Sequence, residues 1–127
     1  IEKRLNKTLQ DIKDEKGYMY LREIEQEIVL AISASIQIIS TGGSVIYSEK
    51  AIAHLKQISS VVFIDTPYKL INKRIGDASK RGFSAPDGFS VKEAFDERMP
   101  LYQKHQDFTV DGTNSADYII KSIEQWI

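Results

Sequence analysis

Three arginines and a glycine pair are the residues of this chain whose types could bind an anionic ligand. Arg22, Arg81 and Arg98 each offer a planar guanidinium group, which can bind a carboxylate or phosphate through two parallel hydrogen bonds. Gly42 and Gly43 follow an apolar, β-branched run, and glycine lets backbone N–H groups approach an anion or a hydroxylated ligand closely. Together these residues indicate a site for a small acid or a phosphate, provided that the fold brings them together.

Simpler interpretations of the same residues stay open on the sequence alone. The glycine pair could serve only as a strand-to-helix turn, for which glycine is the default residue. Arg22 could pair with Glu25, which lies three residues later on the same helix face. Arg98 could pair with Glu93 or Glu97, and most arginines are exposed to solvent.

The elements that must position these residues are mostly helices. Apolar residues recur at helical spacing with charged residues between them, and Ser, Thr or Asn precedes most of the periodic segments. Pro67 suits the first helical position, Ser90 and Glu93 form a capping box, and Pro100 should perturb the end of its helix. The predicted helices cover residues 2–14, residues 20–35, Ser48 to about Gln57, Thr66–Pro67 to Ile75, Ser90 to about Met99 or beyond, and Asn114 or Ser115 to Trp126.

Strands are predicted at residues 36–41, 61–65 and 107–112. The first two are apolar without clean alternation, which is typical of strands that are covered on both faces. Strands that alternate with helices favour a parallel sheet with helices on both faces and right-handed crossovers. Ligands of such sheets bind beyond the carboxyl ends of the strands, which is where Gly42 and Gly43 stand. Three strands are few for such a sheet, and a missing N-terminal βαβ unit would supply more.

Length and composition narrow the class of protein. The 127 residues indicate one domain, residues 1–127, with an irregular segment at 77–89. A net charge of −1 argues against a nucleic acid or an anionic membrane as partner. The chain has no cysteine, which excludes disulfides and thiolate zinc sites, and with only two histidines we expect no His-rich metal site. Neither a membrane-length apolar run nor a signal peptide is visible, and we expect a cytoplasmic protein, most simply a monomer.

Several strings of residues resemble the shikimate kinases in order and spacing. They are "GYMYLREIEQEIV", "STGGSVI", "VVFIDTP", "KRG" and "ERMPLYQKHQDFTVD", and "IEKRLNKTLQDI" is similar to the segment that follows the family's acidic strand end. The resemblance covers essentially all 127 residues. It implies an α/β fold of the P-loop NTPase type, three-layered α/β/α with a parallel sheet, whose N-terminal βαβ portion is missing from this chain.

The resemblance also implies a function and a role for each candidate residue. Shikimate kinases move the γ-phosphoryl group of ATP to a hydroxyl group of shikimate with Mg²⁺, in aromatic amino-acid biosynthesis. Matching positions would place Arg74 against the adenine and Arg81 in a lid, residues 77–89, that closes over the phosphates as the catalytic arginine. The residues that would hold the small-molecule substrate are Arg22, Glu25, Gly42, Gly43 and Arg98, with the arginines on its carboxylate and Glu25 orienting Arg22 or touching a hydroxyl group.

Three departures from the family pattern motivate two alternatives. The chain contains no G-x-x-x-x-G-K-[ST] loop, Ser44 stands where the family usually has a third glycine, and Arg81 begins Arg-Gly-Phe-Ser instead of Arg-Pro-Leu-Leu. The lid departure raises the alternative of a related kinase for another hydroxy acid such as gluconate. The absent loop raises the alternative of a non-catalytic fragment that binds a carboxylated ligand or a partner.

Overall fold

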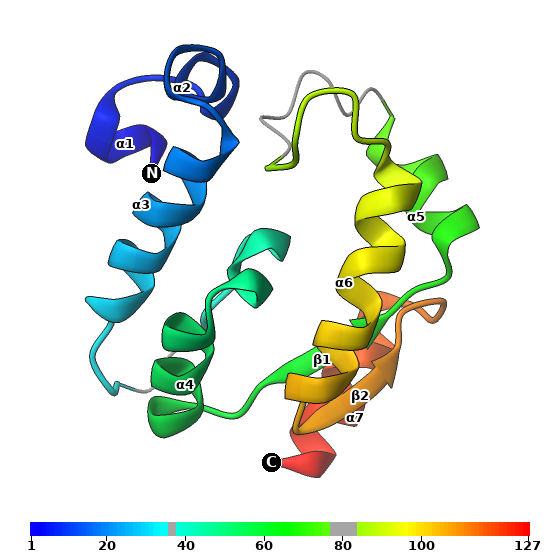
Figure 1. Ribbon diagram of the computed structural model, residues 1–127. Coiled ribbons are helices and arrows are strands. Elements are labelled where there is room, and N and C mark those ends of the chain that lie inside the picture. Colours follow the sequence, from blue (N-terminus) through cyan, green and yellow to red (C-terminus); the bar gives the residue numbers. More distant parts are fainter. Residues whose placement is uncertain (36–37, 77–83) are drawn as a thin grey trace. The chain divides into compact units, whose positions relative to one another are not determined.

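The computed structural model describes residues 1–35, 38–76 and 84–127 of an α/β chain that divides into two compact units. Unit 1 comprises Ile1–Ser59 and Asp77–Ser90, and its described elements are helical. Unit 2 comprises Ser60–Gly76 and Val91–Ile127, and it contains the parallel strands. Figure 1 labels the α-helices and the strands of both units.

Unit 1 is built from four α-helices and one 3₁₀ helix in its described part. Asn6 adopts a left-handed conformation with φ of 50°, so the helix predicted over residues 2–14 is split into two. The helix predicted over residues 20–35 begins earlier, at Tyr18, and ends at Leu30. The elements are α1 (Glu2–Leu5), α2 (Leu9–Lys16), α3 (Tyr18–Leu30), η1 (Gly43–Tyr47) and α4 (Glu49–Ile58).

The hydrophobic core of unit 1 lies between α3 and α4, as the helical spacing predicts. Ser48 caps α4 because its side chain accepts a hydrogen bond from the backbone N–H of Ala51. The side chains of η1 close this core next to the glycine pair, since Val45 and Ile46 are both buried. The buried apolar residues of α2, α3 and α4 are Ile12, Leu21, Ile24, Val29, Ala51, Ile52 and Leu55.

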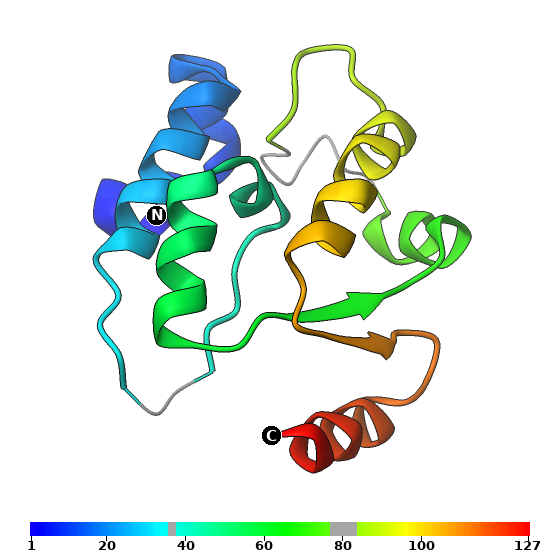
Figure 2. The same ribbon diagram turned by 60° about the horizontal axis from the view of Figure 1, so that its bottom comes forward.

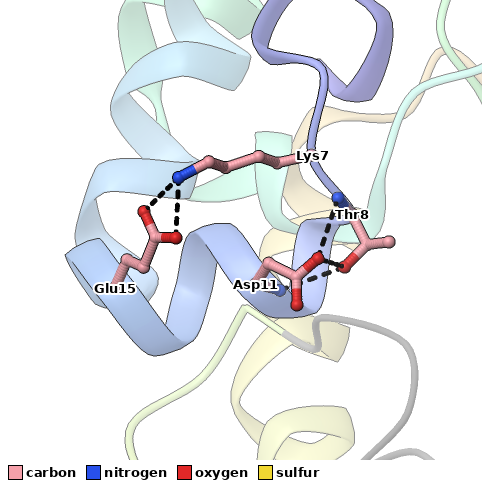
Figure 3. Close-up of polar contacts among 4 residues, drawn as sticks. All are labelled: Lys7, Thr8, Asp11 and Glu15. Carbon is pink, nitrogen blue, oxygen red and sulfur yellow. Dashed lines mark hydrogen bonds and ion pairs between the residues drawn. The ribbon is translucent and has the colours of Figure 1, made fainter.

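A capping box at Thr8 starts α2. The hydroxyl oxygen of Thr8 accepts from the backbone N–H of Asp11 at 3.1 Å, and the Thr8 backbone N–H donates to the Asp11 carboxylate at 3.4 Å. Figure 3 shows this reciprocal pair beside the contact of Lys7 with Glu15. Lys7 Nζ lies 2.7 Å and 2.6 Å from the two carboxylate oxygens of Glu15, and both side chains are about half exposed.

Unit 2 is a small three-layer sandwich. Strand β1 (Val62–Asp65) pairs in parallel with β2 (Phe108–Asp111), with Val62 opposite Phe108. Figure 2 shows the two strands between α6 (Val91–His105) and α7 (Ala116–Trp126). Helix α5 (Tyr68–Ile75) follows β1 and packs against α6.

Alternating side chains of the strands fix which helix covers which face. The ring of Phe108 stacks on Trp126 of α7 with centroids 4.9 Å apart. The ring of Phe63 stacks on Tyr102 of α6 at 5.3 Å. Phe63 lies opposite Thr109, the neighbour of Phe108, so the two stacks lie on opposite faces of the sheet. Within unit 2 the expected helix–sheet–helix layering is therefore present.

The strand predicted over residues 36–41 is not formed in the described part of that segment. Residues 36–37 lie outside the described ranges, and residues 38–41 have no strand conformation. Ile38 is 98% exposed, although its apolar type suggested burial. No backbone hydrogen bond joins residues 38–41 to another described segment, and a strand exists only where a neighbour supplies those bonds.

Two smaller expectations about helices are also wrong. Pro67 is the N-cap of α5 and not its first helical residue. Pro100 does not disturb the end of its helix, because α6 continues through it to His105, five residues beyond the proline. None of the helices in the described ranges is both long enough and apolar enough to cross a bilayer.

We predict that Thr8→Ala lowers the free energy of unfolding by about 1 kcal/mol, because it removes the acceptor that caps α2. Urea unfolding followed by far-ultraviolet circular dichroism measures this change. Lys7→Ala is the matched control, since the half-exposed pair with Glu15 should contribute less than about 0.5 kcal/mol. An effect of Lys7→Ala as large as that of Thr8→Ala would contradict the prediction.

Candidate functional site

Arg22 projects from α3 against aromatic rings of unit 1. Its guanidinium carbon lies 3.7 Å from the ring centroid of Tyr47 and 5.0 Å from that of Tyr18. One terminal nitrogen donates to the backbone carbonyl of Ser84 at 3.4 Å. The Nε atom is buried and has no hydrogen-bond partner. The guanidinium group is therefore held by stacking, with donor capacity left over for a ligand.

The carboxylate of Glu25 is held by the loop that contains the glycine pair. Ser44 Oγ donates to Glu25 Oε2 at 2.6 Å. Gly42 adopts an ordinary extended conformation, but a Cβ atom added to it would clash with Glu25 Oε1. A side chain at position 42 would therefore require the end of the Glu25 side chain to move, but the backbone itself is not strained.

Arg22 and Glu25 do not form an ion pair with each other, within the part of the chain that the structure describes. Among the described residues, the only acceptor of Arg22 is the Ser84 carbonyl, and the only donor to Glu25 is the Ser44 hydroxyl. The simpler interpretation, that these two residues neutralise each other along the helix face, is therefore wrong. Within residues 1–35, 38–76 and 84–127, no acidic side chain forms an ion pair with Arg22.

A cleft of about 180 Å³ opens where α3 meets η1. It is smaller than the roughly 300–1,000 Å³ typical of pockets for drug-sized ligands, and so suits a small metabolite. Its wall includes Arg22 of α3 and Ser44, the residue that follows the glycine pair. The cleft therefore lies between two regions in which site residues were predicted. The lining residues are Met19, Arg22, Glu23, Gln26, Ser44, Val45, Tyr47 and Ser48.

The described end of the segment 77–89 contacts helices α2 and α3 of unit 1. Ser84 is buried, and its hydroxyl group donates to the Tyr18 carbonyl at 3.4 Å. Ala85 is 2% exposed, and Asp87 forms an ion pair with Lys13 at 3.5 Å. Arg81 itself lies outside the described residues, so its predicted position in the lid is not tested.

The remaining predicted residues lie on separate elements. Gly43 begins η1, next to Gly42. Arg98 is a buried residue of α6 in unit 2. Arg74 of α5 donates to the carbonyl of Gly112 at 3.4 Å, and it therefore lies at the loop that follows β2. The structure thus brings Arg22, Glu25 and the glycine pair together in unit 1, and it places Arg74 at the carboxyl edge of the sheet in unit 2.

That edge of the sheet is tightly packed around Gly112. Its backbone N–H donates to the carbonyl of Asp65 at 2.7 Å. An added Cβ atom would clash with the hydroxyl group of Thr66 and would lie 2.9 Å from Ile64 Cγ2. The ends of β1 and β2 are therefore held together by a residue that cannot carry a side chain.

Asp111, at the end of β2, has a lowered pKa. Its carboxylate accepts from the hydroxyl group of Thr113 at 2.7 Å and from the Thr113 backbone N–H at 2.8 Å. These two hydrogen bonds favour the charged form and hold the pKa of Asp111 below its usual value. The carboxylate thus fixes the loop between β2 and α7.

Sequence reasoning missed Tyr47 and the contact made by Ser44. Tyr47 carries no local signal, because it reaches Arg22 from 25 positions away in the sequence. The sequence identified Ser44 only as a residue that stands where the family usually has glycine, and it did not predict the hydrogen bond to Glu25. Among the described residues, no group of three or more acidic or histidine side chains could hold a metal ion.

We predict that Asp111→Asn destabilises the protein near neutral pH and that the difference disappears in acid. A lowered pKa in the folded state gives stability above the ordinary pKa, and this stability is lost as the pH falls through the folded-state pKa. Urea unfolding at a series of pH values from about 7 down to about 2 measures the difference between the wild type and the variant, which should shrink steadily below about pH 5. Thr113→Val, which keeps only the backbone donor, should show part of the effect, and a difference independent of pH would refute the assignment.

Known proteins resemble this chain over its whole length. A family model described as "Shikimate kinase" matches residues 1–127. The shikimate kinase of Aquifex aeolicus is 30% identical over 124 residues, which cover 97% of this chain and 73% of that protein. The shikimate kinase of Bacillus mycoides is 30% identical over 129 residues, which cover 100% of this chain and 78% of that protein.

A solved structure extends the similarity to the fold. The crystal structure of the Aquifex aeolicus shikimate kinase matches with a TM-score of 0.80 at 30% sequence identity. The match covers 98% of this chain and 74% of that chain. This similarity confirms the predicted α/β fold with a parallel sheet, of the P-loop NTPase type.

Proposed function

The chain belongs to the shikimate kinase family, and we propose that it transfers the γ-phosphoryl group of ATP to a hydroxyl group of shikimate. The observation that carries the proposal is the match of the family model across residues 1–127. Members of this family are kinases that act on a small molecule and use ATP. Phosphoryl transfer depends on positioning and on cations around the moving group more than on covalent chemistry by the protein.

Arg22 is the residue best prepared to bind the carboxylate of the substrate. The ring of Tyr47 lies 3.7 Å from its guanidinium carbon and limits its movement, and no acidic side chain among the described residues pairs with it. A preordered arginine loses less conformational freedom when it binds a carboxylate through two hydrogen bonds. We assign Glu25, Gly42 and Gly43 to the hydroxyl side of the same ligand, and Arg98 to its carboxylate by the resemblance.

The nucleotide side is assigned by the resemblance alone. Arg74 would lie against the adenine, and Arg81 in the segment 77–89 would close over the phosphates. Mg²⁺ would accompany ATP, but the described residues include no acidic cluster that fits it, and the 127 residues contain no G-x-x-x-x-G-K-[ST] loop.

The setting of the reaction is proposed from composition and family. We propose that residues 1–127 act as one domain of a cytoplasmic, monomeric enzyme of aromatic amino-acid biosynthesis. The net charge of −1 supports the absence of nucleic-acid and anionic-membrane partners.

A coupled assay of ATP turnover tests the proposal directly. The protein is expressed from its complete coding region and supplied with ATP and Mg²⁺, with either shikimate or gluconate as acceptor. We expect turnover with shikimate and little with gluconate. A preference for gluconate would refute the substrate, and the absence of turnover with both would refute the kinase assignment for this protein.

We predict that Arg22→Lys raises the KM for shikimate by about 10- to 100-fold, with a smaller change in kcat. Lysine keeps the charge but loses both the planar pair of donors and the stacking on Tyr47, and a hydrogen bond to a charged group contributes about 1.5–3 kcal/mol. Steady-state kinetics at varied shikimate measures the change.

Arg4→Lys is the matched control for this variant. Arg4 pairs with Glu27 at 3.3 Å, and both side chains are largely exposed, so its replacement should leave the KM unchanged. Equal kinetic effects of the two variants, or an unchanged KM in Arg22→Lys, would exclude Arg22 as the carboxylate-binding residue.

A further inference from the structure

Ser44 brings a hydroxyl group into the wall of the cleft where α3 meets η1. It stands at a position where the family usually has a third glycine, and therefore no side chain. The next two residues of η1, Val45 and Ile46, are buried in the core of unit 1 and hold this segment in place. Ser44 itself is partly buried. The cleft of this chain thus contains a fixed hydroxyl group that a glycine could not supply.

The hydrogen atom of the Ser44 hydroxyl group is used by Glu25. Ser44 Oγ donates to Glu25 Oε2 at 2.6 Å, and a carboxylate has no hydrogen to give in return. A serine hydroxyl group has one hydrogen and two lone pairs, so Ser44 can meet a ligand only as an acceptor. In the described ranges of the chain, no donor is bonded to Ser44 Oγ. Donation to a carboxylate also polarises the hydroxyl group, which makes its oxygen a better acceptor.

The other serine of the wall, Ser48, is already bonded within the protein as a donor and as an acceptor. Its hydroxyl group donates to Gln26 Oε1 at 2.6 Å and accepts from the backbone N–H of Ala51 at 3.1 Å. A ligand at Ser48 would have to compete with the cap of α4. Ser44 is therefore the serine of the cleft whose oxygen is open to a ligand, while Arg22 offers only donors.

We propose that Ser44 determines specificity by accepting a hydrogen bond from a hydroxyl group of the acid that Arg22 binds. Arg22 requires an anionic group on the ligand, and Ser44 requires a donor on the same ligand. An acid without a hydroxyl group would displace water from the Ser44 oxygen and leave it unpaired, which weakens binding. The cleft therefore selects hydroxy acids. That this acid is shikimate rests on the proposed function.

Two acids that differ only in their hydroxyl groups test this role. Cyclohexenecarboxylate has the ring and the carboxylate of shikimate without its hydroxyl groups. NMR titration of the protein from its complete coding region measures both dissociation constants and requires no turnover. The preference for shikimate is the constant of cyclohexenecarboxylate divided by that of shikimate. This preference isolates the hydroxyl contact, because a change in carboxylate binding alters both constants alike.

We expect the wild type to prefer shikimate, and we expect Ser44→Ala to lower this preference about two- to tenfold, the effect of one hydrogen bond. Ser44→Gly also removes the hydroxyl group and introduces the residue that the family usually has, so it should lower the preference to a similar extent. A wild type without the preference, or a preference that is unchanged in both variants, would overturn the proposal.

Glu23→Ala and Ser59→Ala are the controls. The exposed carboxylate of Glu23 is a second acceptor in the wall of the cleft. Ser59 lies outside that wall, and its hydroxyl group donates to the Leu55 carbonyl at 2.8 Å. We expect both controls to keep the wild-type preference. A loss of preference in Glu23→Ala without one in Ser44→Ala would assign the hydroxyl contact to Glu23 and contradict the role of Ser44.

The same titrations separate failure of this inference from failure of the proposed function. If the wild type turns over gluconate and not shikimate, the substrate assignment is wrong, and gluconate is then compared with hexanoate, its unhydroxylated counterpart. A lowered preference for gluconate in Ser44→Ala would support the role of Ser44 without the proposed substrate. If the wild type turns over shikimate and Ser44→Ala keeps its preference, the function holds and the role of Ser44 is refuted. Binding of neither hydroxylated acid would also refute this role.

Discussion

An arginine guanidinium group is always charged in a protein, so a partly buried arginine needs neighbouring groups that stabilise its charge. At Arg22 these groups are two aromatic rings and one backbone carbonyl, and the neighbouring carboxylate is turned onto a serine. These contacts require η1 to pack against α3 in one position, with Tyr47 over the guanidinium group and Ser44 beside Glu25. The buried side chains of Val45 and Ile46 hold it there, which makes the small core of unit 1 a condition for the site.

Most of the helices, and two of the three strands, could be predicted because their signals are local. Amphipathic spacing with a serine cap defines α4 and α7, and spacing alone identifies α3, whose end at Leu30 falls short of the predicted residue 35. Strands β1 and β2 lie inside the predicted segments 61–65 and 107–112. The segment 36–41 is apolar like the segments that form β1 and β2, but it can become a strand only if another strand pairs with it, and the composition of the segment does not show whether one does. Pro100 does not end α6, although proline usually breaks a helix. Residues before and after it anchor the helix, since Phe95 packs on Tyr68 and Tyr102 packs on Phe63, and Pro100 itself is exposed.

The candidate site was predictable in its residue types and less so in its contacts. Arg22, Glu25 and Gly42 were identified from spacing and resemblance, and the structure places them together in unit 1. The i, i+3 rule suggested an Arg22–Glu25 pair, whereas among the described residues the Glu25 carboxylate accepts from Ser44, 19 positions away. The contact of Tyr47 with Arg22 could not be predicted for the same reason, because local spacing carries no information on contacts between distant positions. Arg81 and the roles assigned to Arg74 and Arg98 still rest on the resemblance.

The stack of Trp126 on Phe108 has a consequence for spectroscopy of this protein. Trp126 is the only tryptophan in the sequence, and it is 38% exposed at the end of α7. Intrinsic fluorescence excited at the indole band therefore reports on the docking of α7 against β2 within unit 2. A difference between the fluorescence and circular dichroism midpoints would show that the two units melt separately, and coincident midpoints would show that they melt as one cooperative block.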